Sequence, residues 1–181
     1  MTDWKAQTVD GNFAVLLHAP VLESLERLCH EAGTSETGGI LIGRYSDDRS
    51  VALVCEATPP PSDSRRGRSW FVRGVNGLRQ MLGTKWRAEE RTYYVGEWHF
   101  HPVDHVEPSP EDFSQMVEIG RTNEYDCKEP LMIILGTGRR DGLRALRAYV
   151  CPVERSPLEL VPERVGHPAS VAILGRDGSG S

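Results

Sequence analysis

The chain has 181 residues, of which 39% are hydrophobic, so it can form one globular domain with a substantial core. Its 26 acidic and 21 basic residues give a net charge of −5, which argues against nonspecific nucleic-acid binding as its main task. No apolar run approaches the roughly 20 residues of a membrane span, so we expect no association with a membrane.

The first third of the chain predicts a leader, a strand and a helix. Residues 1–10 form a polar leader that lacks the apolar segment of a signal peptide. A strand is predicted over residues 13–17. A helix then starts at Pro20 and ends at Gly33, because Leu22, Leu25, Leu28 and Cys29 recur at helical spacing.

The middle of the chain predicts three strands and a second helix. Strands are expected over residues 40–45, 50–57 and 70–73. The short arginine cluster Arg65, Arg66 and Arg68 precedes the third strand, and we interpret it as a solvated loop. Residues 75–89 are predicted to be helical, with an apolar side that we assign to the core and that consists of Leu78, Met81, Leu82 and Trp86.

The chemically distinctive segment is Gly96-Glu97-Trp98-His99-Phe100-His101-Pro102. The β-branched and aromatic residues before it predict a strand that ends at Pro102. Side chains two apart on a strand share a face, so His99 and His101 project together. A helix to about residue 123 is predicted to begin at Ser109-Pro110-Glu111-Asp112, and Ser109 and Asp112 share one of its faces.

Two imidazoles and one carboxylate are ligands that a catalytic zinc uses, with the fourth position kept for water. The pKa of such a water falls from about 15.7 to roughly 7, which makes hydroxide available at neutral pH. We therefore predict one Zn²⁺ per chain, bound by His99, His101 and Asp112, in a hydrolytic metalloenzyme. Glu36, at a glycine-rich approach to an apolar strand, is the candidate base.

Together these residues resemble the motif of the JAMM (JAB/MPN+) metalloprotease family. That motif is E-x-x-G, then H-x-H, ten residues of which the first is proline, and an aspartate with a serine three residues before it. The matches, within a domain over roughly residues 11–151, are Glu36 with Gly39, His99, His101 with Pro102, Ser109 and Asp112. The resemblance implies that the histidines and the aspartate bind zinc, that Glu36 is the general base and acid, and that Ser109 steadies the tetrahedral oxyanion.

Two further strands, over residues 131–135 and 143–150, complete the predicted body. The order of elements predicts an α/β (α+β) single domain with a mixed β-sheet sandwiched by helices. The resemblance implies a JAMM/MPN-type fold with cytidine-deaminase-like architecture. Residues 152–174 are expected to form a wrapping tail, and residues 175–181 a flexible linker or a cloning remnant.

The resemblance also implies a function. It predicts a deubiquitinase-like zinc isopeptidase or peptidase that cleaves after the C-terminal glycine of a ubiquitin-like protein, in precursor processing or deconjugation. The run over residues 96–102, with Glu129-Pro130-Leu131-Met132, resembles the bacterial branch encoded in CBASS and related antiviral operons. The expected partners are the tail of the ubiquitin-like protein, its conjugates, and operon-encoded activating and conjugating enzymes.

The four cysteines, Cys29, Cys55, Cys127 and Cys151, are scattered and contain no C-x-x-C pair. This spacing predicts free thiols in a reducing cytoplasm.

Alternative interpretations of the individual residues stay open. The segment from Ser109 to Asp112 alone is a good helix cap, the histidines alone could be packing residues, and Glu36 alone could be a solvated loop acid. His105 is a rival ligand, four residues after His101. Glu97 shares the strand face of both histidines and is a rival base, an orienting neighbour, a groove residue or a buried acid.

Two alternative functions stay open as well. One is a JAMM peptidase that acts on a sulfur-carrier protein in cysteine or cofactor biosynthesis. The other is a non-catalytic MPN scaffold that binds partners within a complex.

Overall fold

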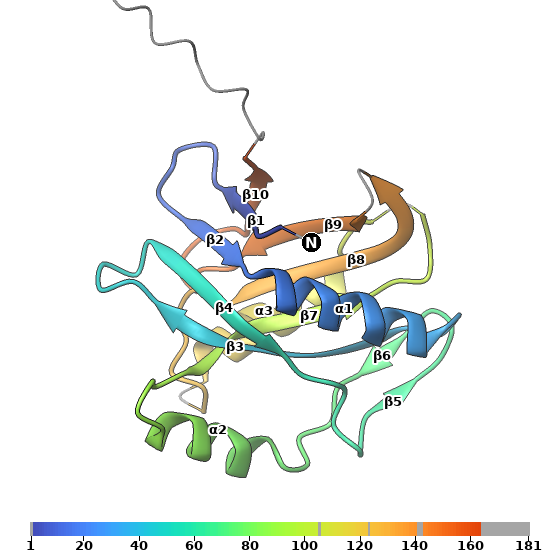
Figure 1. The fold of residues 1–181 in the computed structure, drawn as a ribbon, viewed down its shortest axis with the longest axis horizontal. Coiled ribbons are helices and arrows are strands. Elements are labelled where there is room, and N and C mark those ends of the chain that lie inside the picture. Colours follow the sequence, from blue (N-terminus) through green and yellow to red (C-terminus); the bar gives the residue numbers. More distant parts are fainter. Residues whose placement is uncertain (1, 105, 123, 141–142, 164–181) are drawn as a thin grey trace, which may run out of the picture.

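The computed structural model describes residues 2–104, 106–122, 124–140 and 143–163 (Figure 1). The strands are β1 (Trp4–Gln7), β2 (Ala14–Leu17), β3 (Thr37–Tyr45), β4 (Val51–Ala57), β5 (Arg65–Arg66), β6 (Phe71–Val72), β7 (Tyr93–Phe100), β8 (Leu131–Arg140), β9 (Leu143–Val150) and β10 (Leu158–Pro162). The helices are α1 (Ala19–Ala32), α2 (Leu78–Arg87) and α3 (Pro110–Arg121).

The main sheet closes into a barrel with the strand order β1-β10-β9-β8-β7-β3-β4-β2. Strands β2 and β4 pair in parallel, as do β7 and β8, and the other neighbours are antiparallel. Strands β5 and β6 form a separate small hairpin. The chain is therefore a single mixed α/β domain, as the order of its elements predicts.

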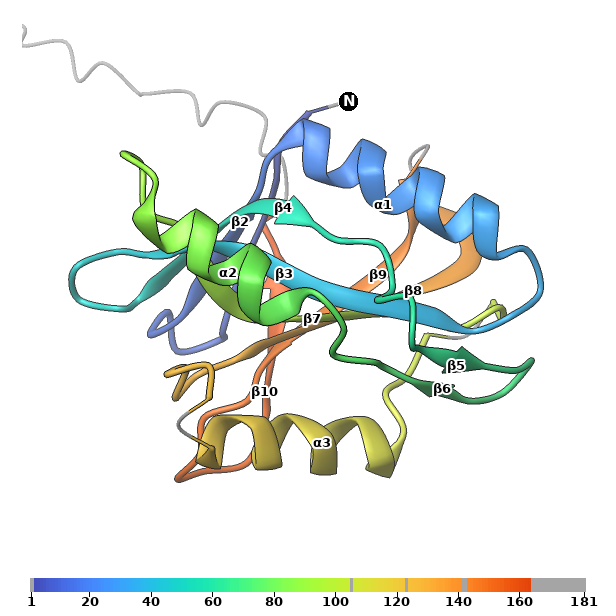
Figure 2. The same cartoon turned by 90° about the horizontal axis from the view of Figure 1, so that it is seen from below.

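Helices cover both faces of the sheet, and each face has its own apolar cluster. One cluster joins α1, through side chains such as Leu25, to the inner face, where Trp98 and Phe100 are fully buried. The other joins Leu78 of α2 and Met116 of α3 to the opposite face. Figure 2 shows α1 and α3 on opposite sides of the strands. This arrangement confirms the predicted sheet between helices.

The barrel is closed by two strands that the sequence did not predict. Strand β1 lies in the expected polar leader and β10 in the expected wrapping tail, and they pair with each other. Both strands are short. Trp4 and Ala6 in β1, and Leu158 and Leu160 in β10, alternate with exposed residues, so each apolar pattern spans only three positions. Residues 164–174 of the expected tail, and the expected linker, lie outside the described residues.

Two expectations for the middle of the chain are wrong in part. Arg65 and Arg66 are not in a loop, because they form β5 and pair with Val72 and Phe71. Within α2 only Leu78 is fully buried, whereas Trp86 is 52% exposed, so the apolar side of this helix belongs only partly to the core.

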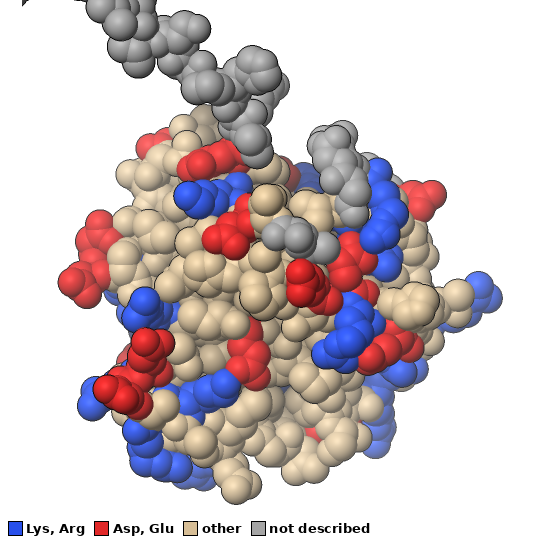
Figure 3. Space-filling model, in the orientation of Figure 1, with Lys and Arg blue, Asp and Glu red and all other residues tan. Residues whose placement is uncertain are grey.

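Basic and acidic side chains are interspersed on the face shown in Figure 3.

Strand β7 contains a β-bulge that decides which side chains face the site. Leu41 pairs with Gly96 but Ile42 pairs with Tyr94, so Val95 is an extra residue in β7. The bulge places Tyr94 and Glu97 on the same face although they are three residues apart, with Tyr94 Oη 3.4 Å from Glu97 Oε1. His99 follows on that face, while Trp98 points into the inner cluster.

Candidate metal centre

His99 and His101 lie at the carboxyl end of β7, in the middle of the sheet. His99 pairs with Gly38 of β3 and Ile134 of β8, and the backbone N–H of His101 donates to the carbonyl of Leu135 at 2.9 Å. The extended backbone therefore continues through both histidines, as two imidazoles two residues apart require. His99 is buried and His101 is half-buried.

Asp112 comes from the first turn of α3, which a capping box holds in place. The Ser109 hydroxyl accepts from the Asp112 N–H at 3.1 Å, and the Asp112 carboxylate accepts from the Ser109 N–H at 2.7 Å. The Ser109 hydroxyl also donates to Asp112 Oδ2 at 2.8 Å. The helix cap and the orientation of the Asp112 carboxylate thus depend on the same serine.

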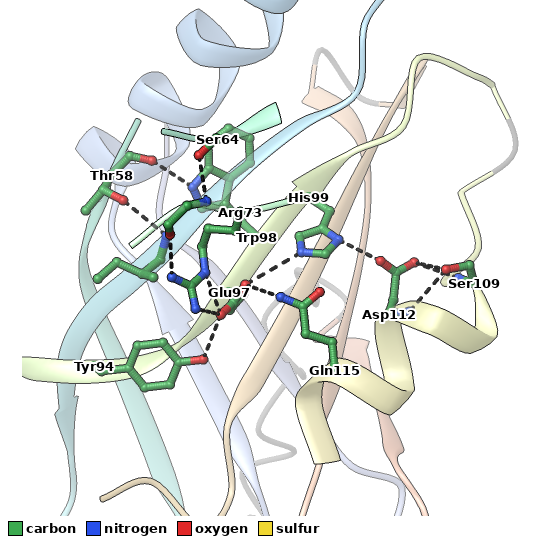
Figure 4. Close-up of polar contacts among 12 residues, drawn as sticks. Thr58, Ser64, Arg73, Tyr94, Glu97, Trp98, His99, Ser109, Asp112 and Gln115 are labelled. Carbon is green, nitrogen blue, oxygen red and sulfur yellow. Dashed lines mark hydrogen bonds and ion pairs between the residues drawn. The ribbon is translucent and has the colours of Figure 1, made fainter. Parts of the chain in front are cut away.

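The structure brings the three predicted ligands together. One ligand atom from each of His99, His101 and Asp112 lies within 4.8 Å of the others. Figure 4 shows His99 facing Asp112. His99 Nδ1 is 2.7 Å from Asp112 Oδ1, and His101 Nε2 is 3.7 Å from Asp112 Oδ2. Tetrahedral zinc, with ligand distances of about 2.0–2.2 Å, separates its ligand atoms by roughly 3.4 Å. The observed spacings bracket that value, so the group can hold a metal ion.

The ionisation of this group reflects its close contacts. Burial opposes the charged forms of both partners, but the hydrogen bond between them lowers the pKa of Asp112 to about 2. The same bond, with Glu97, raises the pKa of His99 to about 9. Burial lowers the pKa of His101. In the metal-free protein the pair of His99 and Asp112 is therefore an imidazolium and a carboxylate, and a metal ion that binds there must displace the proton of His99.

Glu36 immediately precedes β3 and lies near the same group. Its backbone N–H donates to the carbonyl of Gly67, and the next two residues pair with Phe100 and His99. Burial and the charge of Asp112 raise the pKa of Glu36, and His99 partly offsets this effect. The carboxylate is thus in the electrostatic field of the site and is a better proton acceptor than a solvated glutamate.

Gly38 and Phe71 shape the space around His99. A Cβ at Gly38 would lie 2.5 Å from the Trp98 carbonyl oxygen, 2.8 Å from the Phe71 ring and 3.0 Å from the His99 ring. The Phe71 ring, on β6, meets His99 edge-on with 5.9 Å between ring centroids. The predicted glycine-rich entry to this strand therefore lets the backbone at Gly38 lie close to Trp98 and to the rings of Phe71 and His99.

Glu97 contacts His99 and lies in a buried polar network. Its Oε2 is 3.8 Å from His99 Nε2, and its side chain is fully buried in an ion pair with Arg73 at 2.9 Å. Gln115 Nε2 is 3.4 Å from the same Oε2. These contacts place Glu97 beside a candidate ligand. His105 lies outside the described residues.

Three further residues contact the site and were not predicted: Arg73, Phe71 and Gln115. Gln115 follows Asp112 by three residues on α3, so helical spacing alone would have placed it on the same face. Phe71 in β6 and Arg73 just after it carry no such signal, because they lie far before the motif in sequence, with Arg73 24 residues before Glu97.

In chemical terms, the arrangement combines a donor set for a divalent cation, a carboxylate with a raised pKa, and a serine hydroxyl beside them. This is the set of groups that metal-assisted hydrolysis needs.

The fold and the site define a JAB-type domain. Residues 18–149 match the family described as prokaryotic homologs of the JAB domain, and the chain belongs to that family.

Two relatives, each described as a "CD-NTase/cGAS isopeptidase", are similar over most of their length. The protein from Enterobacter hormaechei subsp. hoffmannii is 46% identical over 148 residues, which cover 82% of this chain and 81% of that protein. The protein from Pseudomonas aeruginosa is 32% identical over 140 residues, which cover 75% and 84%.

The fold is also similar to a solved structure. The solution structure of protein DSY2949 from Desulfitobacterium hafniense superposes with a TM-score of 0.52 at 16% identity, over 80% of this chain and 86% of that one. No helix within the described ranges is long and apolar enough to cross a membrane.

Proposed function

We propose that this protein is a zinc-dependent isopeptidase or peptidase that cleaves after the C-terminal glycine of a ubiquitin-like protein. The observation that carries the proposal is the donor group of His99, His101 and Asp112, with Glu36 in its electrostatic field. A scaffold has no need for this complete set of groups.

His99, His101 and Asp112 would hold the ion, which lowers the pKa of a bound water to roughly 7. Glu36 accepts the proton of the attacking water, and the oxygen of that water bonds to the scissile carbonyl carbon. Glu36 then gives its proton to the amine nitrogen as the C–N bond breaks. The raised pKa of Glu36 suits both transfers, because a group that accepts and then donates works best near the ambient pH.

Ser109 is the candidate donor to the oxyanion of the tetrahedral intermediate. In the structure its hydroxyl hydrogen points at Asp112 Oδ2. To serve the oxyanion, the hydroxyl must turn away from Asp112 while the backbone N–H of Ser109 keeps the carboxylate in place.

The relatives support the substrate class, because each is described as a "CD-NTase/cGAS isopeptidase". We propose that this chain likewise releases a ubiquitin-like protein from a conjugated nucleotidyltransferase or processes its precursor, in an antiviral operon of the CBASS type. Activating and conjugating enzymes would supply the conjugate. The four cysteines are unpaired, which fits a cytoplasmic protein.

The tail of the substrate is proposed to bind as an added strand whose backbone hydrogen bonds supply affinity. Space near His99 is narrow, because Phe71 and the backbone at Gly38 approach the ring closely. The residue that supplies the scissile carbonyl should therefore be glycine, since a β-carbon would obstruct the approach. The residue after the scissile bond should matter less, because the amine can come from a lysine side chain.

The test is incubation of the zinc-loaded protein with ubiquitin-like proteins that carry C-terminal extensions, followed by intact mass measurement. We expect a single cut after the last glycine, no cut when that glycine is valine, and small rate changes when the next residue varies. Efficient cleavage of the valine substrate or of casein would indicate a general peptidase instead. Cleavage of sulfur-carrier proteins alone would favour the biosynthetic alternative. A protein that binds no added zinc and cleaves none of these substrates would favour a scaffold.

A further inference from the structure

The buried carboxylate of Glu97 is held by several neighbours, and one of them is a candidate metal ligand. Arg73 donates to Oε1 through Nε at 2.9 Å, and Tyr94 Oη lies 3.4 Å from the same atom. The other carboxylate oxygen, Oε2, lies 3.4 Å from Gln115 Nε2 and 3.8 Å from His99 Nε2. Figure 4 shows Glu97 between Arg73 and His99.

This ion pair is poorly explained as a device for stability. The side chains of Glu97 and Arg73 are 0% and 6% exposed, and removing two charges from water costs about as much as their attraction returns. An apolar pair of similar volume would satisfy the core equally well. The arrangement therefore points to a task that requires a charged acceptor at this position.

The His99 ring shows what that task is. Its Nδ1 is bonded to Asp112, whereas its Nε2 is buried and has no hydrogen-bond partner among the described residues. The carboxylate oxygen that Nε2 faces is Glu97 Oε2, just beyond hydrogen-bond distance. A histidine that binds a metal through one ring nitrogen almost always gives the N–H of the other to such an acceptor.

We propose that Arg73 and Glu97 are a positioning pair for the metal centre. Glu97 receives the Nε2–H of His99 and so keeps Nδ1 as the nitrogen that faces Asp112 and the ion. Arg73 keeps Glu97 in place, and it is itself held by the carbonyl of Gly74 at 2.9 Å and by Tyr125 Oη at 3.3 Å.

The pair also makes the β5–β6 hairpin part of the metal centre. Phe71, in β6, packs edge-on against the His99 ring, and Arg73 follows β6 directly. The hairpin thus constrains His99 twice, once through the ring edge and once through Glu97. This inference rests on the proposed metal centre, and it adds residues that carry no part of the hydrolytic chemistry.

The test compares zinc affinity in two double variants. Arg73→Met with Glu97→Leu removes both charges together, which avoids leaving an unpaired buried ion. The matched control is Arg144→Met with Glu26→Leu, which removes a largely buried ion pair between β9 and α1 whose side chains are 14% and 18% exposed. We expect the first variant to lose about 10- to 100-fold in zinc affinity, measured by competition with a chromogenic chelator, and the control to bind as the parent does.

A second measurement separates positioning from folding. The visible absorption spectrum of the cobalt-loaded protein reports ligand geometry, and it should shift in the Arg73/Glu97 variant but not in the control. Arg73→Met with Glu97→Gln retains a neutral acceptor without leaving an unpaired buried charge, and it should lose affinity only near the lower end of the same range. It also serves as the test if the first double variant does not fold.

Three outcomes overturn the proposal in distinguishable ways. Parent affinity in the Arg73→Met/Glu97→Gln variant and in the Arg73/Glu97 variant would refute the positioning role and leave the metal centre intact. Equal losses in the Arg73/Glu97 variant and the control would assign the effect to folding. A parent protein that binds no zinc would remove the proposed function and this inference together.

Discussion

Gly38 of β3 pairs directly with His99 of β7, and the imidazole fits there because residue 38 has no side chain. A Cβ at this position would press on a backbone carbonyl and on the rings of Phe71 and His99 at once. The carbonyl belongs to a central strand and cannot move freely, so one added methyl group should disturb both the sheet and the site.

Gly38→Ala should lower the free energy of unfolding by about 1–3 kcal/mol, the usual cost of overpacking. Gly83→Ala in α2 is the matched control, because the nearest atom to its Cβ would be Arg87 Nη1 at 3.6 Å. That change should be neutral or stabilising by up to about 1 kcal/mol. Urea unfolding of both variants measures the difference, and equal stabilities would mean that the close packing at Gly38 is not rigid.

Asp112→Ala should abolish most zinc binding, because it removes one of three protein ligands and leaves two imidazoles. Glu111→Ala changes an exposed acid in the same first turn of α3 and should retain zinc. Metal analysis after gel filtration gives the stoichiometry, with about one zinc per chain expected in the parent. Equal zinc in both variants would exclude Asp112 as a ligand.

Glu36→Gln should leave zinc content and substrate binding unchanged while turnover falls by at least about 100-fold, the contribution expected of a general base. Glu31→Gln, at the exposed end of α1, is the control and should turn over normally. Initial rates by intact mass, at saturating substrate, make the comparison. A near-normal rate for Glu36→Gln would transfer the role of base to another group.

Zinc binding should release a proton at neutral pH. In the metal-free protein, the hydrogen bond to Asp112 and the nearby carboxylate of Glu97 outweigh burial and raise the pKa of His99 to about 9. Its ring therefore carries two protons at pH 7, whereas zinc requires the neutral form. Apparent affinity should therefore fall by about tenfold per pH unit as the pH drops below about 9. A histidine with an ordinary pKa of about 6.5 would give no such slope above pH 7.

Calorimetry in buffers of different ionisation enthalpy measures the number of protons released. Release close to one proton at pH 7.5 is expected for the parent protein. Release close to zero would show that His99 is already neutral before zinc arrives.

The local patterns explain why the centre of the fold and the donor group could be predicted. His99 and His101 are two apart in a strand and Ser109 caps the helix of Asp112, so short-range rules place each pair. The barrel brings β7 and α3 together. The ten residues between His101 and Asp112 indicate this contact only because the family motif has the same spacing.

Features that depend on contacts distant in sequence were missed. Strands β1 and β10 alternate apolar and exposed residues over only three positions each, a pattern too short to predict that they pair with each other. Nothing in the sequence around Arg73 distinguishes it from an ordinary solvated arginine. Only the fold places it against Glu97, 24 residues later in the chain. Trp86 continues an apolar helical spacing but lies half in solvent, because α2 covers the sheet mainly through Leu78.

The pairing of β1 with β10 has a consequence for how the molecule assembles. Ala6 meets Pro162 across this seam, so the barrel closes only by joining segments separated by nearly the whole described chain. Contacts of such long range slow folding, because the loop entropy is lost before the contacts form. Until β10 arrives, β1 and β9 present unpaired edges, which are templates for other strands. Aggregation during expression is therefore expected to depend on residues 158–162, which lie far in sequence from the metal ligands.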